Sequence, residues 1–200
     1  MLAQTHKIIG SHLHDNIEKK TGIKLNRNLL IYGSIKPDIW PTLAVKKHYK
    51  DKSFGFVIDE IESLMALGLH DNPISINRFS VKLGIITHFL SDFFCLPHHD
   101  RDYFHDKLKE HLTYEKRLHD SFKAFSGLKN VNMPYMDGIS RQNIIKFIEE
   151  LHLEYKDNPA GYINDVRGSI NVSSAIGILV SEHSVVTSKS LQKAAGYSGY

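Results

Sequence analysis

Apolar residues recur every three to four positions over most of this chain, which is the spacing of an amphipathic helix. No stretch alternates apolar and polar residues as a half-buried strand does, so the sequence predicts an all-α fold. Capping residues and glycines place the helix ends. The predicted helices cover about residues 4–20, 26–33, 53–68, 74–94, 105–125, 140–155 and 162–185, with Asn26, Ser53 and Ser140 as N-caps.

Two prolines interrupt this pattern between Ser34 and Pro41. Proline disfavours a helical conformation in the residue before it, so Pro37 is expected to keep Lys36 extended. Asp38 is therefore predicted to lie on a stiff loop. Residues 193–200 contain glycine and serine and are expected to form a frayed tail. The chain has 200 residues, of which 42% are hydrophobic, and this is enough to form one core. We therefore predict a single-domain helical bundle over residues 1–200.

Composition excludes several classes of protein. The formal net charge of +3 is small and does not by itself argue for nucleic acid. Cys95 is the only cysteine, so no internal disulfide can form. The first residues lack a signal-peptide pattern, and no apolar stretch is long enough to cross a bilayer, so a cytoplasmic location is expected. Histidine is abundant, at 13 residues, which favours a metal site.

The chemistry centres on residues 84–99, a mostly apolar stretch that carries His88 and Asp92 four positions apart. Residues at this spacing project from the same face of a helix. Burying an imidazole and a carboxylate without a partner is costly. A metal ion best explains both, because imidazole nitrogen and carboxylate oxygen are common zinc ligands. A buried hydrogen-bonded pair is the alternative.

A second pair with this spacing occurs at His111 and Glu115. Further nitrogen and oxygen ligands are available on the first helix, on the proline-rich loop, on the segment after it and just behind Asp92. One zinc needs about four ligands, so eight could serve two or three ions, with one residue bridging. We predict a multinuclear zinc site at one end of the bundle, with candidate ligands His6, Asp38, His48, His88, Asp92, His98, His111 and Glu115.

The order of these motifs resembles the bacterial zinc-dependent phospholipase C family, whose all-α trinuclear zinc fold is shared by P1-type nucleases. The resemblance extends from about Thr5 to Glu115 and rests on the following elements: Thr-His6, Lys-Pro-Asp38, His48, HxxxD at His88 and Asp92, Pro-His98, and HxxxE at His111 and Glu115. The segment from Asp92 to His98 matches in spacing as well as in order.

The resemblance implies a ligand set for each ion. One zinc would be held by Asp38, His48, His88 and Asp92, and a second by His98, His111 and Glu115. A third would be held by His6 and by Asp92 as a bridge. In the family, an N-terminal Trp completes this third site with its amino group and carbonyl. This chain begins with Met1 and Leu2 and offers no such Trp.

We predict a zinc-dependent phosphodiester hydrolase of the phospholipase C type. Its ions would neutralise the phosphate oxygens and lower the pKa of a bound water, so that zinc-bound hydroxide attacks the diester. Asp38 is the candidate for orienting or deprotonating this water. The expected substrate is a phospholipid or a small phosphodiester, with peripheral membrane contact, and the loop from Lys129 to Gly138 offers an apolar lip or an ordinary linker.

Three alternatives remain open. A P1-type nuclease on the same fold would stack bases on aromatics such as Tyr49, Phe54 and Trp40. An HD-type metal phosphohydrolase would use one of the His-Asp dipeptides, with Asp100 as a ligand. An inactive metal-binding protein would use the fold for interaction.

Overall fold

The regular elements of this protein are helices throughout the residues that its computed structural model describes, which are 1–99, 107–135 and 138–196, with side chains to residue 190. The all-α prediction is confirmed. The helices are α1 (Ala3–Thr21), α2 (Arg27–Ile39), α3 (Pro41–Ala44), α4 (Lys50–Leu67), α5 (Pro73–Phe93), α6 (Leu96–His99), α8 (Leu108–Ala124), α9 (Arg141–Asp157) and α10 (Tyr162–Gly196).

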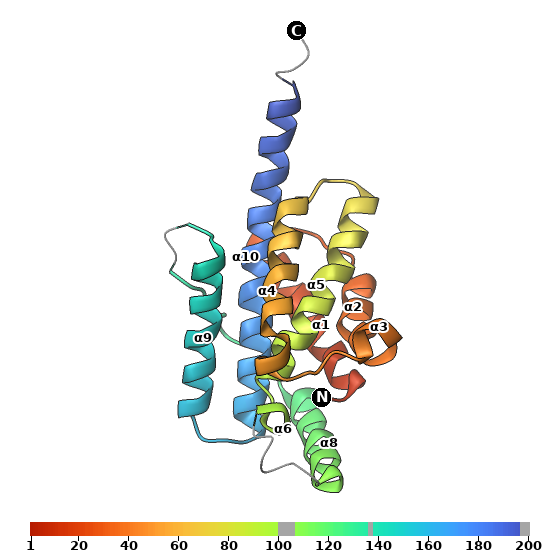
Figure 1. Cartoon of the computed structure of the whole chain (residues 1–200), viewed down its shortest axis with the longest axis vertical. Helices are drawn as coiled ribbons and strands as arrows, with labels where there is room; N and C mark the ends of the chain where they lie inside the picture. Colours follow the sequence, from red (N-terminus) through yellow and green to blue (C-terminus); the bar gives the residue numbers. More distant parts are fainter. Residues whose placement is uncertain (100–106, 136–137, 197–200) are drawn as a thin grey trace.

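Helix α5 lies at the centre and packs against α1, α2, α4 and α10 (Figure 1). Its second half is buried from Ile86 to Phe93, because its apolar residues are not confined to one face. Helix α10 is the longest element, and its C-terminal end projects beyond the other helices (Figure 1). Helix α9 covers one side of α10, while α8 lies at the opposite end from the C-terminus (Figure 1). The bundle forms one compact domain.

Two glycines allow α2 and α5 to approach at backbone distance. A Cβ atom on Gly33 would lie 2.3 Å from the carbonyl oxygen of Val81, and one on Gly84 would lie 2.3 Å from that of Leu30. Real side chains do not fit at such distances, so glycine is required at both positions. This close contact brings the end of α2, with Ser34 and Asp38, against His88 of α5.

The predicted loop from Ser34 to Pro41 is wrong, because α2 continues through Pro37 to Ile39. Asp38 therefore lies on the last turn of a helix. A proline this close to a helix end removes only one backbone hydrogen bond, and its ring is buried in the core. Packing against α5 thus outweighs the local preference of the residue before proline. The chain turns only at Trp40, and Pro41 opens the short helix α3.

The other helix boundaries test the capping signals. The Asn26 side chain accepts a hydrogen bond from Leu29 N, and Ser140 accepts one from Asn143 N, so both predicted N-caps are confirmed. Ser53 is not a cap, because α4 begins at Lys50 and the Ser53 hydroxyl instead donates to the Lys47 carbonyl. Helix α10 extends past the predicted end to Gly196, so residues 193–196 are helical rather than frayed. The predicted helix start at His105 and the tail 197–200 lie outside the described residues.

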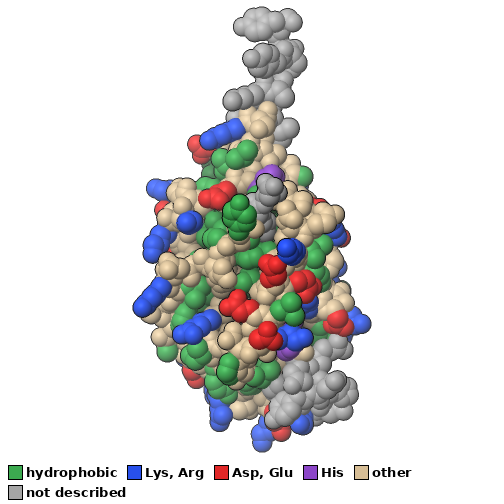
Figure 2. Space-filling model, turned by 90° about the vertical axis from the view of Figure 1, so that its left-hand side faces the viewer, with side chains coloured by type: hydrophobic (Ala, Val, Ile, Leu, Met, Phe, Trp, Pro, Cys, Tyr) green, Lys and Arg blue, Asp and Glu red, His purple; other side chains and the backbone are tan. Residues whose placement is uncertain are grey.

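Figure 2 shows the face formed around α9, where acidic and basic side chains alternate with apolar ones. Arg141 of α9 forms ion pairs with Asp59 and Glu62 of α4, and Lys50 pairs with Glu149 at 2.7 Å. The charges on this face are therefore of both signs and partly paired. Within the described part of the chain, no helix combines the length and the apolar composition that a membrane crossing requires.

Candidate metal centre

The eight side chains singled out in the sequence meet at one end of α5. They arrive from α1, α2, the segment before α4, α5, α6 and α8. Within the described residues they form three groups, in each of which the ligand atoms lie within 4.8 Å of one another. The groups are His6–His88–Asp92, Asp38–His48–His88 and His98–His111–Glu115.

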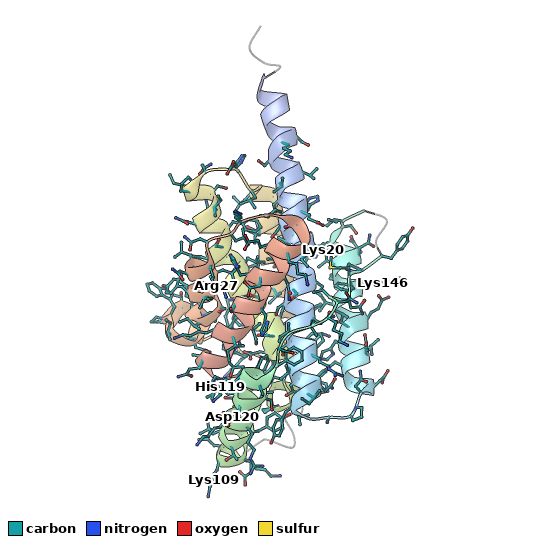
Figure 3. The ribbon with its side chains drawn as sticks, turned by 180° about the vertical axis from the view of Figure 1, so that it is seen from behind. Lys20, Arg27, Lys109, His119, Asp120 and Lys146 are labelled. Carbon is teal, nitrogen blue, oxygen red and sulfur yellow. The ribbon has the colours of Figure 1, made fainter. Side chains whose placement is uncertain are left out.

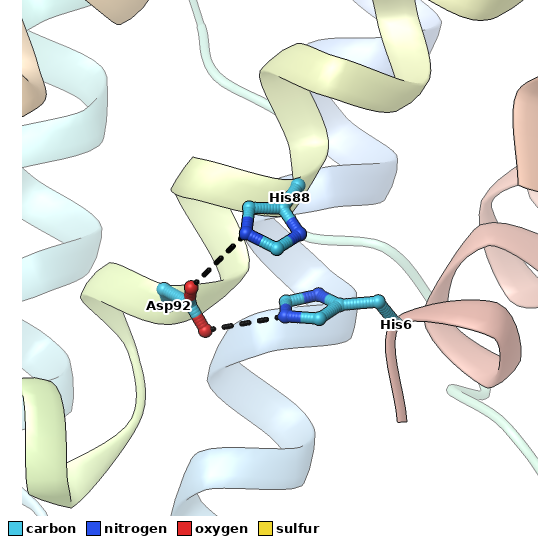
Figure 4. Close-up of side chains that lie close together, drawn as sticks. All are labelled: His6, His88 and Asp92. Atoms are coloured by element: carbon cyan, nitrogen blue, oxygen red, sulfur yellow. Dashed lines mark ion pairs between the residues drawn. The ribbon is translucent and has the colours of Figure 1, made fainter. Parts of the chain in front are cut away.

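The first group is fully buried, and Figure 4 shows its two imidazoles facing the carboxylate. His6 Nε2 lies 3.4 Å from Asp92 Oδ1, and His88 Nε2 lies 3.4 Å from Asp92 Oδ2. Each carboxylate oxygen of Asp92 thus faces a different histidine. This arrangement suits a carboxylate that bridges two ions.

Hydrogen bonds behind the rings fix which nitrogen carries the proton. His88 Nδ1 lies 2.8 Å from the Ser34 carbonyl oxygen, which can only accept, so Nδ1 is the donor. The Ser91 hydroxyl donates to the His88 carbonyl and therefore accepts from His6 Nδ1 at 3.2 Å. Both Nε2 atoms are left with a lone pair that points at Asp92. Metal-binding histidines are held in the same way by a partner on the second ring nitrogen.

The second group lies at the mouth of the centre. His48 Nδ1 is 2.9 Å from Asp92 Oδ2, and Asp38 Oδ1 is 3.6 Å from His88 Nε2. The Asp38 side chain is 23% exposed and that of His48 is 17% exposed, whereas His88 is inaccessible. Within this group, a small molecule from solvent would therefore reach Asp38 and His48 before His88.

The third group joins α6 to α8. One oxygen of Glu115, Oε1, lies 2.9 Å from His111 Nε2 and 3.2 Å from His98 Nε2. His111 and Glu115 are one helical turn apart, which explains how one helix supplies both. The short helix α6 places His98 between this pair and Asp92, whose Oδ1 is 3.9 Å from His98 Nε2.

One further group, the α-amino group of Met1, was not among the eight candidates but lies at this centre. It donates to Asp92 Oδ1 at 2.9 Å, lies 3.3 Å from Glu115 Oε1, and is 2.9 Å from His98 Nε2. A backbone amine is invisible to a motif search over side chains. Its positive charge is the largest favourable electrostatic influence on Asp92.

Burial and charge set the protonation of the centre. Burial lowers the pKa of the Met1 amino group, but Asp92 and Glu115 more than offset this and raise it to about 12. Burial raises the pKa of Asp92, but the amino group and His98 hold it well below its usual range. Burial lowers the pKa of His88 far below that of a free imidazole. Ionised carboxylates and neutral imidazoles are the forms that bind metal.

The spacings fit a metal of zinc's size. Atoms about 2.1 Å from a tetrahedral ion lie about 3.4 Å apart, and the ligand atoms of each group lie within 4.8 Å of one another, with the closest contact, His111 to Glu115, at 2.9 Å. His6 Nε2 and Asp38 Oδ2 are also buried without a hydrogen-bond partner among the described residues. A cation would satisfy these atoms, which otherwise carry a desolvation cost.

The model of a protein family described as zinc-dependent phospholipase C matches residues 5–162 of this sequence. This is well over half of the chain. The chain belongs to the zinc-dependent phospholipase C family. The match includes all eight predicted ligands, and it leaves out Met1 and most of α10. Searches among curated proteins and among solved structures found no match.

The three groups of His, Asp and Glu side chains agree better with this family than with an HD-type site built on a His-Asp dipeptide. Of the His-Asp dipeptides that are described in full, none belongs to the three groups. Asp15 pairs with Arg27, His70 contacts Ser188 on α10, and the exposed Asp120 pairs with Lys123 on α8. Figure 3 labels His119 and Asp120 on this helix. The dipeptides completed by Asp100 and Asp106 lie outside the described residues.

Proposed function

We propose that this protein is a zinc-dependent phosphodiester hydrolase of the phospholipase C type, with its catalytic centre at the three His/Asp/Glu groups. One observation carries the proposal. Side chains from six segments bring their nitrogen and carboxylate oxygen atoms to shared points, with the Nε2 lone pairs of His6 and His88 facing Asp92, and bound cations would offset the cost of this burial. Family membership names the metal and the substrate class.

The zinc ligands we propose are the eight predicted residues. The Met1 amino group donates to Asp92 Oδ1 as an ammonium, so it would have to lose a proton before it could bind an ion there. Bound zinc would neutralise the anionic diester and lower the pKa of a coordinated water. We leave the number of ions, two or three, to measurement.

Asp38 is our candidate for orienting the attacking water and accepting its proton. Its carboxylate lies at the mouth of the centre, and its Oδ2 has no hydrogen-bond partner among the described residues. Burial raises the pKa of Asp38, and nearby Asp92 adds to this, whereas His6 lowers it. A carboxylate with a raised pKa is a better proton acceptor near neutral pH than an ordinary aspartate.

A phospholipid surface is the substrate that the rim of the centre supports best. Ile39, Trp40 and Val45 follow Asp38 or precede His48 in the chain and are 57%, 49% and 77% exposed. Lys36 lies over the Trp40 ring at 5.2 Å. Exposed tryptophan and aliphatic side chains beside lysine are typical of a surface that enters a lipid headgroup layer. In the loop proposed as a lip, Met133 packs against the core, Tyr135 is fully exposed, and Met136 lies outside the described residues.

The experiment compares one protein on three substrates. The purified protein is analysed for bound zinc, and hydrolysis is measured on phosphatidylcholine vesicles, a soluble chromogenic phosphodiester and single-stranded DNA. Each assay is repeated after chelation and after zinc is restored. His88→Ala should lose activity, whereas His183→Ala, on α10 away from the centre, should keep it.

The result on each substrate distinguishes a different proposed function. We expect chelator-sensitive cleavage of vesicles, and Trp40→Ala should slow it several-fold while leaving the soluble diester unaffected. Cleavage of DNA alone would identify the nuclease. Zinc content without turnover on any substrate would favour the inactive binding protein. Activity unchanged in metal-stripped protein would overturn the proposal.

A further inference from the structure

Asp165 is a buried carboxylate in the first turn of α10, beyond the end of the family match. Its Oδ2 accepts hydrogen bonds from Leu96 N and from the Tyr114 hydroxyl, both at 3.0 Å. Its Oδ1 accepts one from the Tyr155 hydroxyl at 2.8 Å. Helices α8, α9 and α10 and the α5–α6 junction thus meet at a single side chain.

Two of these donors lie directly beside predicted zinc ligands. Leu96 opens α6 and comes two residues before His98. Tyr114 precedes Glu115 on α8 and follows His111 by three positions. The third donor, Tyr155, lies on α9, which carries no predicted ligand. One carboxylate therefore connects the two segments that must stay in register for His98 and Glu115 to share an ion.

The segment that carries His98 needs such an anchor. Helix α6 has only four residues, too few to be stable by its own hydrogen bonds. Ser169, one turn after Asp165, donates to the carbonyls of Ser91 and Phe94 and fixes the end of α5. Asp165 extends this attachment past the end of α5 to Leu96, where the backbone turns towards the centre.

We propose that Asp165 is a positioning residue of the His98–His111–Glu115 group, acting on Leu96 and Tyr114. This inference rests on the proposed function, because it takes that group to bind zinc. Groups that orient metal ligands from behind typically change metal affinity about 10- to 100-fold when they are removed. A buried acid that served stability alone would show no such bias towards one ion.

Two matched substitutions separate positioning from stability. Tyr114→Phe and Tyr155→Phe each remove one hydroxyl donor from the same carboxylate, but only Tyr114 adjoins a ligand. We expect Tyr114→Phe to weaken one zinc site about 10-fold, measured by competition with a chromophoric chelator. Tyr155→Phe should leave that affinity within about two-fold of the wild-type value. This holds even if Tyr155→Phe lowers the melting temperature as much as Tyr114→Phe does.

Substitutions of Asp165 itself give an independent test. An asparagine can still accept from Leu96 N and Tyr114 through its oxygen while its amide donates to the Tyr155 oxygen, so Asp165→Asn should retain most of the affinity. Asp165→Ala removes every acceptor and should lose it. In the cobalt-substituted protein, Asp165→Ala should also alter the visible absorption band that reports ligand geometry, and Asp165→Asn should restore it.

The outcomes distinguish the two proposals. Wild-type protein that binds no zinc would overturn the proposed function and, with it, this inference. Wild-type protein that binds zinc, with equal affinities in Tyr114→Phe and Tyr155→Phe, would overturn the inference alone. If Asp165→Ala fails to fold, the tyrosine pair and Asp165→Asn decide the question.

Discussion

The two long core helices, α5 and α10, both bury polar side chains, but of different kinds. Helix α5 buries His88 and Asp92 with no exposed surface. Helix α10 buries a series of serines, and one of them, Ser184, donates its hydroxyl to the Val180 carbonyl one turn earlier. A hydroxyl can be satisfied by its own helix, whereas an imidazole and a carboxylate need a partner from outside.

This difference shows which buried polar groups need a partner from outside their own helix. Along α10, buried serines can lie in a helix-packing interface that excludes water. Along α5, the same degree of burial leaves lone pairs directed at other helices, and the fold must bring a cation or a donor to them. Asp165 resembles the α5 pair in this respect, because its partners come from other elements, and Ser169 of α10 likewise donates to the carbonyls of Ser91 and Phe94.

The largest expected effect is the difference in zinc binding and activity between a substitution of a buried residue on α5 and one on α10. His88 belongs to two of the three groups, so His88→Ala should reduce bound zinc and lower hydrolysis by more than about 100-fold. Ser184→Ala should keep both within about two-fold, because it removes only a local hydrogen bond. Metal analysis and vesicle hydrolysis measure the two. Full zinc content in His88→Ala would mean that the α5 histidine is structural.

Zinc removal should destabilise the α5 end without unfolding α10. A ligand at about a thousand times its dissociation constant adds about 4 kcal/mol of stability, which for a chain of this length is about 8 to 16 °C in melting temperature. We expect calorimetry to show a fall of this size after chelation. Circular dichroism should show the helix content retained, because the apolar core does not include the ligands. Loss of helix at low temperature would show that the metal is needed for folding.

Asp165 of α10 should make the stability of the folded protein depend on pH. Burial raises the pKa of Asp165 from 3.8 to about 6, although Leu96 N and the two tyrosines oppose the change. The folded protein thus binds this proton more tightly than the unfolded chain does. The resulting stabilisation is present below about pH 4 and is lost as the pH rises through about 6.

Asp165→Asn should remove this contribution. Two pKa units correspond to about 3 kcal/mol, so the difference in unfolding free energy between variant and wild type should change by up to this amount from pH 4 to pH 7. Denaturant titrations in chelator, at several pH values, measure it. A difference that stays constant with pH would show that Asp165 titrates as an exposed aspartate does.

The sequence could predict the parts of the molecule that depend on local patterns. Helical periodicity and the caps Asn26 and Ser140 located most helices, and the i, i+4 pairs placed His88 with Asp92 and His111 with Glu115 on shared faces. The structure brings all eight candidates together, and their role as zinc ligands remains a prediction.

Other features depended on contacts that no local pattern encodes. Pro37 suggested a loop, but the glycine contact between α2 and α5 makes helix the better packed choice. The Met1 amino group and Asp165 carry no motif, since each acts through partners far away in the chain. Tertiary context decided these positions, and all three lie at or behind the metal centre.

The smallest expected effect tests the α10 side of the comparison. The hydroxyl of Ser181 is buried without a hydrogen-bond partner among the described residues, unlike that of Ser184. Removing an unsatisfied hydroxyl relieves its desolvation cost, so Ser181→Ala should be neutral or stabilising by up to about 1 kcal/mol. Ser184→Ala, which breaks a made bond, should be destabilising by a similar amount. Chemical denaturation of both variants measures the difference, and a Ser181→Ala protein less stable than Ser184→Ala would show that the Ser181 hydroxyl does make a stabilising hydrogen bond.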